Sequence, residues 1–315
     1  MARSLAVLMD AIADIKIAKD TTFALLLEAQ RRGYRISYLT HGDLAIRNGV
    51  PFARLATLAV RDQPGDWFSL GEAQWKDLRT FDVVLARKDP PVDEQFIHDT
   101  QVLQLAHDGG VLVVNDPQGL RDANEKLFAQ HFPQCCAPTL VARDAAELKR
   151  FAAEQGRVVL KPLDGMGGRS IFLSGHGDPN LNVILETLTG NGRAFAMAQK
   201  FIPEISAGDK RILMVDGEPV PYALARIPQG DEFRGNLAAG GKGVGVPLSE
   251  RDRWIAAQVG PELKRRGMLF VGLDVIGDFL TEVNVTSPTC LRELDAQFGL
   301  NIAGQLFDVI ESRKA

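Results

Sequence analysis

The chain has 315 residues, 45% of them hydrophobic and 24% charged, and its formal net charge at pH 7 is −4. This length predicts about two domains, and the composition is typical of a folded globular protein. The acidic balance excludes a strongly basic nucleic-acid-binding surface over the whole chain. Glycine is the one residue in excess, because its 30 copies in 315 residues exceed the usual ~7%.

Membrane and secretory signals are missing from the sequence. No stretch of about 18 consecutive apolar residues occurs, so we expect no transmembrane helix and no membrane partner. The apolar run before Asp10 is too short for a signal peptide and is typical of a buried strand. The cysteines Cys135, Cys136 and Cys290 have neither zinc-site nor disulfide-framework spacing. We therefore expect a cytoplasmic protein with reduced cysteines.

The N-terminal part alternates apolar strands with amphipathic helices. Asp20 can cap a helix that begins at Thr21, and a second helix covers roughly Glu94–His107. The sequence predicts strands at Ser4–Met9, Tyr34–Leu39, Phe81–Arg87 and Gly110–Val114. This alternation predicts an α/β domain with a parallel, doubly wound sheet, which binds ligands beyond the carboxyl ends of its strands. Asp10 and Arg87 lie at such ends and are candidate ligand contacts.

The pattern changes near residue 120, and we expect the domain boundary at about residues 120–125. The turn Asn115–Pro117 precedes a predicted helix that runs to about His131. Helices are also predicted at Ala145–Glu154, Asn180–Leu188 and Ser249–Arg266. Hairpin signals occur at Asn48-Gly49 in the first part and at Asp216-Gly217 and Gly277-Asp278 in the second. The second part therefore reads as α+β with antiparallel strand pairs.

A lysine at the end of a strand is followed by a glycine loop. The strand Val158–Lys161 leads into Gly165-Met166-Gly167-Gly168. Backbone N–H groups of such a loop can surround phosphate oxygens while the lysine supplies positive charge. The motif is neither a Walker loop nor a dinucleotide-binding GxGxxG sequence. From the glycines alone, a mobile hairpin loop with an incidental lysine is an equally good interpretation.

A second glycine-rich segment runs from Arg226 to Gly245. Arg234, Asn236 and Lys242 are possible anion donors within it. Long glycine-rich loops between strands are often lids over a site, and we expect residues 227–243 to form one. A solvated linker is the alternative.

Polar residues interrupt two apolar strands near residue 280. Glu282 and Asn284 are two residues apart and share one face of a strand. With a two-residue turn at Gly277-Asp278, Asp274 would face away from Glu282, whereas a three-residue turn would pair Ile276 with Leu280 and set Asp274 opposite Glu282. We adopt the second register, because converging oxygen ligands suit Mg²⁺ shared with nucleotide phosphates. The alternative is a strand with its polar face in water.

Two weaker candidates complete the set. The strand end Gln199–Ile202 could hydrogen-bond an adenine edge, and Asp209 could hold ribose hydroxyls. A strand end followed by a charged loop explains the same residues without a ligand. Lys126 is likewise ordinary by itself, since most helix lysines are solvated.

In chain order these motifs resemble the prokaryotic glutathione synthetases, a family of ATP-grasp ligases. The resemblance covers essentially the whole chain, through Met9-Asp10, Arg87–Pro91, Leu160–Gly168, Arg226–Gln229, Arg234–Gly241 and Asn284–Thr289. Small departures are Lys242, where the family often has arginine, and Val244–Val246 at the end of the loop.

The resemblance implies a fold and a reaction. An N-terminal Rossmann-like (pre-ATP-grasp) α/β domain would cover residues 1–122, and an α+β ATP-grasp domain would cover 123–315, with subdomains of about 123–200 and 201–315. The protein would be a cytoplasmic homotetramer that ligates γ-glutamylcysteine and glycine. ATP would be cleaved to ADP and phosphate through an acyl phosphate, with Mg²⁺ or Mn²⁺ as the metal.

The resemblance also implies a role for each matching residue. Nucleotide contacts would come from Lys126, Lys161, Gly165, Met166, Gly167, Gly168, Gln199, Lys200, Phe201, Ile202, Asp209 and Asn236. The metal would be held by Asp274, Glu282 and Asn284. Arg211 would face the transferring phosphoryl group, and Arg234 would help to close the site. Substrate contacts would come from Asp10, Arg87, Gly240, Gly241, Ser287 and Thr289.

Other activities remain open at this point. Another ATP-grasp ligase, of the D-alanine–D-alanine type or acting on an amino acid, would have an almost identical ATP half. The segments Arg87–Pro91 and Thr286–Thr289 would then decide the substrate. A nucleotide-dependent dehydrogenase would need a glycine-rich turn after the first strand, but Met9–Ala13 contains no glycine. A non-catalytic ATP sensor would lack Glu282 or Asn284, and both are present.

Overall fold

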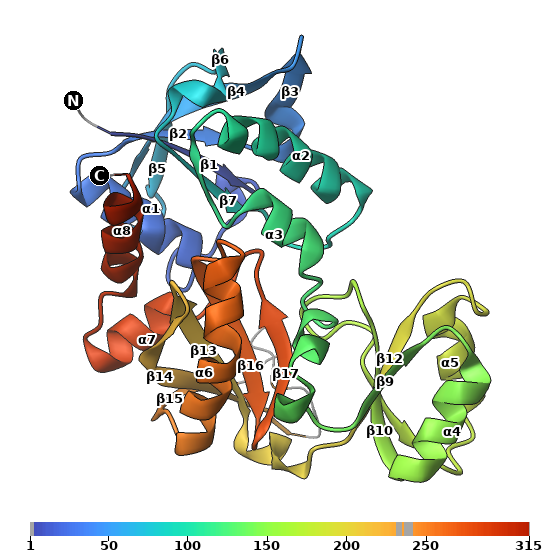
Figure 1. The fold of residues 1–315 in the computed structure, drawn as a ribbon. Coiled ribbons are helices and arrows are strands. Elements are labelled where there is room, and N and C mark those ends of the chain that lie inside the picture. The colour runs from blue at the N-terminus through green and yellow to red at the C-terminus, as the bar shows by residue number, and fades with distance from the viewer. Residues whose placement is uncertain (1–2, 231–234, 236–241, 315) are drawn as a thin grey trace.

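The computed structural model describes residues 3–230, 235 and 242–314. Within these residues the strands form sheets of eight, four and five strands. We call the corresponding parts the N-terminal domain, the four-stranded lobe and the five-stranded lobe. Figure 1 shows the N-terminal domain above the five-stranded lobe, with the four-stranded lobe to one side.

Four strands of the N-terminal sheet are parallel. Their order is β2–β1–β7–β8, with bounds β1 (Ser4–Met9), β2 (Arg35–Leu39), β7 (Val83–Arg87) and β8 (Leu112–Val114). Helix α1 (Thr21–Arg31) connects β1 to β2, and α2 (Glu94–Asp108) connects β7 to β8. Asp20 caps α1 by accepting a hydrogen bond from the Phe23 N–H, which confirms the predicted helix start.

The rest of the N-terminal sheet is antiparallel, so the sheet is mixed rather than doubly wound. The connection from β2 to β7 contains no α-helix in the described structure but four strands, β3 (Leu44–Arg47), β4 (Val50–Val60), β5 (Phe68–Leu70) and β6 (Gln74–Asp77). The predicted hairpin is present, because Asn48 and Gly49 turn β3 into β4 with φ of 51° and 78°. Since β4 is 11 residues long, it reaches past β2 and pairs with β3, β5 and β6 as well.

The helix predicted from residue 117 to about His131 is not continuous. Helix α3 (Pro117–Asp122) ends at Ala123, and a short 3-10 helix, η4 (Phe128–His131), follows after a break. Within the break, Asn124 uses its side-chain oxygen to accept hydrogen bonds from the N–H groups of Lys126 and Leu127. These side-chain bonds replace helical ones and end the helix there.

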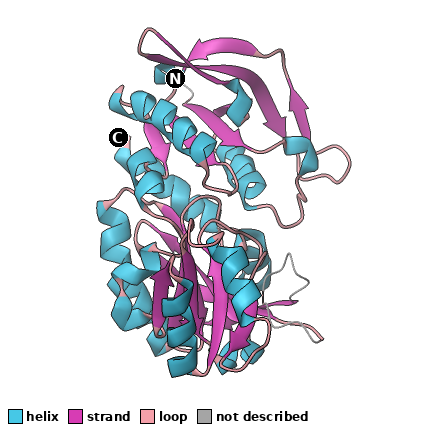
Figure 2. Ribbon diagram, turned by 90° about the vertical axis from the view of Figure 1, so that its right-hand side faces the viewer, coloured by secondary structure: helices cyan, strands magenta, loops and turns pink. Residues whose placement is uncertain are grey.

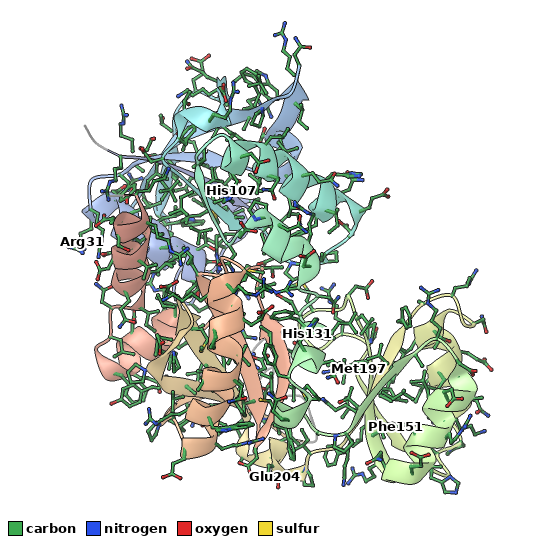
Figure 3. All side chains as sticks on the ribbon, in the orientation of Figure 1. Arg31, His107, His131, Phe151, Met197 and Glu204 are labelled. Atoms are coloured by element: carbon green, nitrogen blue, oxygen red, sulfur yellow. The ribbon has the colours of Figure 1, made fainter. Side chains whose placement is uncertain are left out.

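The four-stranded lobe is antiparallel, with strand order β11–β10–β12–β9. Its strands are β9 (Thr139–Ala142), β10 (Arg157–Pro162), β11 (Phe172–Gly175) and β12 (Ala196–Lys200). The helices α4 (Ala145–Gln155) and α5 (Leu181–Thr189) pack on one face; Figure 3 labels Phe151 on α4 and Met197 on β12. A core cluster of its own fills the space beneath them, formed by Leu148, Ala152, Val158, Leu160, Leu181, Leu185, Leu188, Ala196 and Ala198.

The five-stranded lobe is also antiparallel. Its order is β15–β14–β13–β16–β17, with β13 (Asp209–Val215), β14 (Glu218–Ile227), β15 (Lys242–Pro247), β16 (Phe270–Ile276) and β17 (Phe279–Asn284). Helix α6 (Glu250–Arg265) begins with a capping box between Ser249 and Asp252. The chain ends with α7 (Leu291–Phe298) and α8 (Ile302–Arg313). Figure 2 shows the lobes below the N-terminal domain and the C-terminus beside that domain.

The last helix, α8, returns to the N-terminal domain. Arg32 lies 2.7 Å from Asp308, and the rings of Tyr34 and Phe307 are 5.4 Å apart between their centroids. Figure 1 shows α8 beside α1, near the start of the chain. The two larger core clusters each contain residues of both the N-terminal domain and the five-stranded lobe. These two parts are therefore packed as one body, whereas the four-stranded lobe has a separate core. None of the described helices is long and apolar enough to cross a membrane.

Candidate active site

A pocket of about 270 Å³ lies between the four-stranded and five-stranded lobes. Most of the residues selected from the sequence line it, although they come from distant parts of the chain. They are Lys126, Lys161, Gly165, Met166, Gly167, Gly168, Gln199, Lys200, Phe201, Ile202, Asp209, Arg211, Asp274, Glu282, Asn284, Ser287 and Thr289.

Charged side chains cross the five-stranded sheet in a row on one face. Asp274 on β16 lies opposite Arg211 on β13 and opposite Glu282 on β17. Asp209 on β13 is two residues from Arg211, so it shares that face, and it lies opposite Arg226 on β14. The strand pairing therefore gathers acidic and basic groups at one side of the pocket.

The register of the β16–β17 hairpin differs from the one adopted from the sequence. The turn has two residues and pairs Ile276 with Phe279, so the predicted three-residue turn is wrong. Asp274 nevertheless lies opposite Glu282, because the register shifts between Asp274 and Val275. Thr281 is the extra residue on β17, and its hydroxyl donates to the Asp274 carbonyl at 3.1 Å. A β-bulge, rather than the turn, brings the two carboxylates together.

Two arginines hold the acids of this row. Arg211 donates to both oxygens of Asp274, and the Arg226 Nη2 lies 2.8 Å from Asp274 Oδ2 and 2.5 Å from Asp209 Oδ2. Burial raises the pKa of Asp274, but Arg211 and Arg226 oppose it and keep that pKa well below its usual range. Burial raises the pKa of Asp209 to about 7 in spite of Arg226. Asp209 Oδ1 is buried and has no hydrogen-bond partner within the described part of the chain.

Two buried lysines approach one carboxylate oxygen of Glu282. The Nζ atoms of Lys126 and Lys161 lie 3.6 and 3.5 Å from Glu282 Oε1. Each lysine is only 4% exposed. Burial lowers the pKa of Lys161, and the carboxylate of Glu282 opposes this shift. Two ammonium groups with a single carboxylate between them form a strongly attractive place for a further anion.

Strand alternation directs Lys161 into the pocket. On β10 and β12, Leu160 and Ala198 are paired and face the lobe's own core. Their neighbours Lys161 and Met197, also a pair, therefore face the other way, toward the five-stranded lobe. After β10, Gly167 and Gly168 have φ of 63° and 79°, a region that favours glycine. The loop thus turns sharply above the lysine.

The substrate candidates meet where the N-terminal sheet touches the 286–289 segment. The Arg87 Nη2 donates to the Pro288 carbonyl at 3.0 Å, and Asp10 accepts from the Asp89 N–H at 2.8 Å. Ser287 donates its hydroxyl hydrogen to the carboxylate of Asp89. Burial lowers the pKa of Arg87 to about 10, and no carboxylate among the described residues lies within ion-pair distance of it. Ser287 and Thr289 line the pocket, whereas Arg87 and Asp10 do not and reach it only through their hydrogen bonds to Pro288 and Asp89.

Several residues of the site were given no role from the sequence, among them Arg226, Glu125 and Asp89. All three line the pocket; Arg226 is buried, Glu125 is half-buried, and Asp89 bonds both Asp10 and Ser287. A signal existed for Arg226, since it interrupts an otherwise apolar strand two residues after Leu224. Glu125 and Asp89 sit in short loops, and nothing in the local sequence distinguishes them from solvated acids.

The second glycine-rich segment is only partly described. Arg234, Asn236, Gly240 and Gly241 lie outside the described residues, as does most of the predicted lid at 227–243. Gly235 is described, and a Cβ atom there would lie 2.3 Å from the Arg226 carbonyl oxygen. This close approach to β14 leaves no room for a side chain.

The described residues contain no group of three or more His, Cys, Asp or Glu side chains that could enclose a metal by themselves. The site instead offers two carboxylates, Asp274 and Glu282, and the amide of Asn284. The Asn284 Nδ2 donates to the Gly272 carbonyl at 3.2 Å, which fixes the orientation of the amide. A small set of oxygen donors beside lysines suits a hard cation that takes its remaining ligands from phosphate.

Two family models cover nearly the whole chain. The model described as the prokaryotic glutathione synthetase N-terminal domain matches residues 4–121. The model described as the prokaryotic glutathione synthetase ATP-grasp domain matches residues 125–299.

Curated relatives match over their full length. A protein named glutathione synthetase from Xanthomonas campestris pv. campestris is 70% identical over 315 residues, which is 100% of both chains. One of the same name from Pseudomonas aeruginosa is 56% identical and covers 100% of this chain and 99% of its own.

Solved structures with a similar fold are more distant in sequence. The crystal structure of the D-cycloserine synthetase DcsG matches with a TM-score of 0.65 at 15% identity, over 99% of this chain and 100% of the other. The ATP-grasp ligase PsnB, complexed with minimal precursor, Mg and ADP, matches with a TM-score of 0.62 at 15% identity, over 98% of both chains. At this identity the likeness shows a shared ATP-grasp fold.

Proposed function

The chain belongs to the prokaryotic glutathione synthetase family, and from that premise we propose how its pocket carries out the reaction. The protein is an ATP-dependent ligase, and it joins γ-glutamylcysteine and glycine to give glutathione. One observation carries the assignment of roles: the Nζ atoms of Lys126 and Lys161 lie 3.6 and 3.5 Å from the same carboxylate oxygen of Glu282. This arrangement supports a site for polyphosphate with a bridging cation.

The reaction requires activation of the dipeptide carboxylate that forms the new peptide bond with glycine. A carboxylate resists attack by an amine, because its leaving group would be oxide. Transfer of the γ-phosphoryl group from ATP to a carboxylate oxygen gives an acyl phosphate and releases ADP. The glycine amine then attacks the acyl carbon, loses a proton, and expels inorganic phosphate as the peptide bond forms. In the first step, positioning and neutralisation of charge dominate the rate.

Nucleotide contacts are assigned to both lobes. Lys126 and Lys161 neutralise the phosphates, and the Gly165–Gly168 loop covers them. The end of β12, at Gln199, Lys200, Phe201 and Ile202, receives the adenine, and Asp209 receives the ribose hydroxyls. The buried, unpartnered Asp209 Oδ1 supports this role, because a buried acceptor without a donor is costly unless a ligand supplies one.

The donor set at the row of acids fits magnesium, with manganese as a possible substitute. Asp274, Glu282 and Asn284 would hold it, sharing its coordination sphere with the phosphates. When bound, the ion neutralises negative charge on the phosphate oxygens. Arg211 and Arg226 pair with Asp274 and would place positive charge beside the reacting groups. Arg211 faces the transferring phosphoryl group and donates to the oxyanion that forms during the attack by glycine.

The dipeptide is assigned to the edge shared with the N-terminal domain. Arg87 is a buried guanidinium without a carboxylate partner among the described residues, which supports binding of a substrate carboxylate. Ser287 and Thr289 contribute hydroxyl groups, and Asp10 orients Asp89 beside them. Gly240 and Gly241 would add substrate contacts, Asn236 a nucleotide contact, and Arg234 would help to close the site, although all four lie outside the described residues.

Release of ADP tests this assignment directly. We expect release that requires γ-glutamylcysteine and is accelerated by glycine, measured with a coupled assay. D-Alanine, offered in place of both substrates, should give no release above background. ADP release that does not depend on the dipeptide would contradict the proposal.

We further propose that the protein works as a cytoplasmic homotetramer, as the family resemblance implies. Large apolar side chains on the antiparallel part of the N-terminal sheet support association between copies. Ile46 and Trp75 are 51% and 57% exposed. Light scattering should give four times the chain mass of 34.4 kDa, and a monomer would contradict the assembly.

A further inference from the structure

A three-residue segment, Asn124–Lys126, bonds both lobes at the base of the pocket. Toward the four-stranded lobe, the Asn124 side chain donates to the Leu163 carbonyl at 3.2 Å, and Lys126 Nζ donates to the Gly165 carbonyl at 2.5 Å. Toward the five-stranded lobe, the Glu125 carbonyl accepts from the Val283 N–H at 2.8 Å. The segment therefore adds an outer partner to β17 beyond the five-stranded sheet.

The Glu125 side chain binds the chain that follows β17. A single oxygen, Oε1, accepts hydrogen bonds from the Val285 N–H at 3.0 Å, the Thr286 N–H at 3.2 Å and the Thr286 hydroxyl at 2.9 Å. Thr286 is only 3% exposed. Each of these donors would lose its partner if the backbone shifted, so the three bonds hold the chain after β17 in one conformation.

The segment fixed in this way joins two halves of the proposed active site. Asn284, a candidate metal ligand, immediately precedes Val285, and Ser287 immediately follows Thr286. A shift of the backbone at residues 285–286 would move the metal side and the dipeptide side together. The Lys126 ammonium beside Glu125 would remain bound to Gly165 and would leave the nucleotide side in place.

We propose that Glu125 is a positioning residue, whose carboxylate aligns Asn284 with the dipeptide-binding residues Ser287 and Thr289. This inference rests on the proposed function, because it assumes that the metal and the dipeptide bind on the two sides of residues 285–286. It assigns no contact between Glu125 and substrate. Partners that orient metal ligands from outside the coordination sphere typically change metal affinity or activity by about 10- to 100-fold when they are lost.

The test compares three variants of the full chain with a matched control. Glu125→Ala removes the acceptor, Glu125→Gln keeps an acceptor oxygen without charge, and Thr286→Val removes one donor only. Glu28→Ala is the control, because Glu28 is a buried carboxylate that accepts from Arg31 and Arg32 and does not line the pocket. Steady-state rates give KM for the dipeptide and the half-saturating Mg²⁺ concentration, calorimetry gives the affinity for ATP without Mg²⁺, and thermal unfolding gives stability.

For Glu125→Ala we expect both the KM for the dipeptide and the Mg²⁺ requirement to rise about 10-fold or more, with ATP affinity nearly unchanged. Glu125→Gln should recover most of this loss, and Thr286→Val should show a smaller change in the same direction. The control should lower stability and leave both constants unchanged.

Lower stability with unchanged KM and Mg²⁺ requirement would overturn the inference, as would an equal loss of ATP affinity. If Glu125→Ala does not fold, unchanged constants in both Glu125→Gln and Thr286→Val would overturn it as well. Failure of the proposed function is a separate result, since the unaltered chain would then release no dipeptide-dependent ADP.

Discussion

Arg211 and Asp274 form a two-point ion pair between neighbouring strands, with an Nε–Oδ1 distance of 2.5 Å and an Nη2–Oδ2 distance of 2.9 Å. Both residues are buried, at 6% and 2% exposed. Arg226 reaches the same carboxylate, so Asp274 has two guanidinium partners. The effect of removing one arginine therefore depends on the other members of the network.

The substitution Arg211→Met should lower the free energy of unfolding by about 3 kcal/mol, because it leaves part of a buried charge uncompensated. Adding Asp274→Asn should restore part of that loss, since the uncompensated carboxylate is then absent. Urea unfolding of the parent, the two single variants and the double variant gives the coupling between the residues. Strictly additive effects would show that the pair is not coupled.

The substitution Glu282→Gln should reduce ligation on the order of 100-fold, the scale expected when one preorganised electrostatic contact is removed. It removes the carboxylate that Lys126 and Lys161 share, and with it one proposed metal ligand. Rates measured against Mg²⁺ concentration should show a higher requirement, with a much smaller change in thermal stability. Glu186→Gln, at an exposed position on α5, is the control. An unchanged Mg²⁺ dependence would remove Glu282 from the metal site.

The substitution Gly217→Ala should destabilise the protein more than Gly33→Ala does. Both glycines have positive φ, 85° and 78°. A Cβ atom at Gly217 would lie 2.7 Å from the Gly260 carbonyl oxygen, whereas nothing lies within 4 Å at Gly33. At Gly33 we expect the free energy of unfolding to fall by about 1 kcal/mol, from the backbone conformation alone. At Gly217, where α6 must also move, it should fall by about 2–3 kcal/mol. Equal losses in chemical denaturation would show that the contact with α6 adds nothing.

The substitution Asp295→Asn should flatten the dependence of stability on pH. Burial raises the pKa of Asp295 to about 6, from an ordinary value of 3.8. The folded state therefore binds more protons than the unfolded state between these values, and this contribution to stability is lost as the pH rises toward 6.

Denaturant unfolding gives the free energy of unfolding of each protein. The value for the variant minus that for the parent should be larger above pH 6 than at pH 4. The effect should persist at about 0.5 M salt, because burial rather than a charged partner is the main cause. A difference between the two proteins that does not vary with pH would contradict the raised pKa.

Local patterns predicted much of the secondary structure. The strand Ser4–Met9, the cap at Asp20 and the hairpin at Asn48-Gly49 all occur where the sequence indicates them. Each depends on residues that are close in the chain. The Asp20 side-chain oxygen, for example, accepts a hydrogen bond from the N–H of Phe23, three positions later. Such features are visible without knowledge of the rest of the fold.

The failures lie where distant segments meet. The helix expected to reach His131 breaks at Asn124, and the segment Asn124–Lys126 then bonds both lobes through distant partners such as Gly165 and Thr286. The N-terminal sheet is mixed because β4 pairs beyond its neighbours in the chain. The contacts of Asn124–Lys126 with the two lobes and the additional pairings of β4 join residues that are far apart in sequence, so local propensity does not reveal them.

The sequence by itself indicated the side chains that we propose bind phosphate and metal, because Lys161, Glu282 and Asn284 interrupt apolar strands, where burying a charge or an amide is costly without a partner. Only the tertiary structure decided how they meet. A bulge at Thr281, not the turn, sets Asp274 opposite Glu282, and the folded chain places Arg226 and Glu125 in the lining of the pocket. The physical reason is that a buried charge is stabilised by its partners across the fold, and those partners are fixed by strand register and by the packing of one lobe against another.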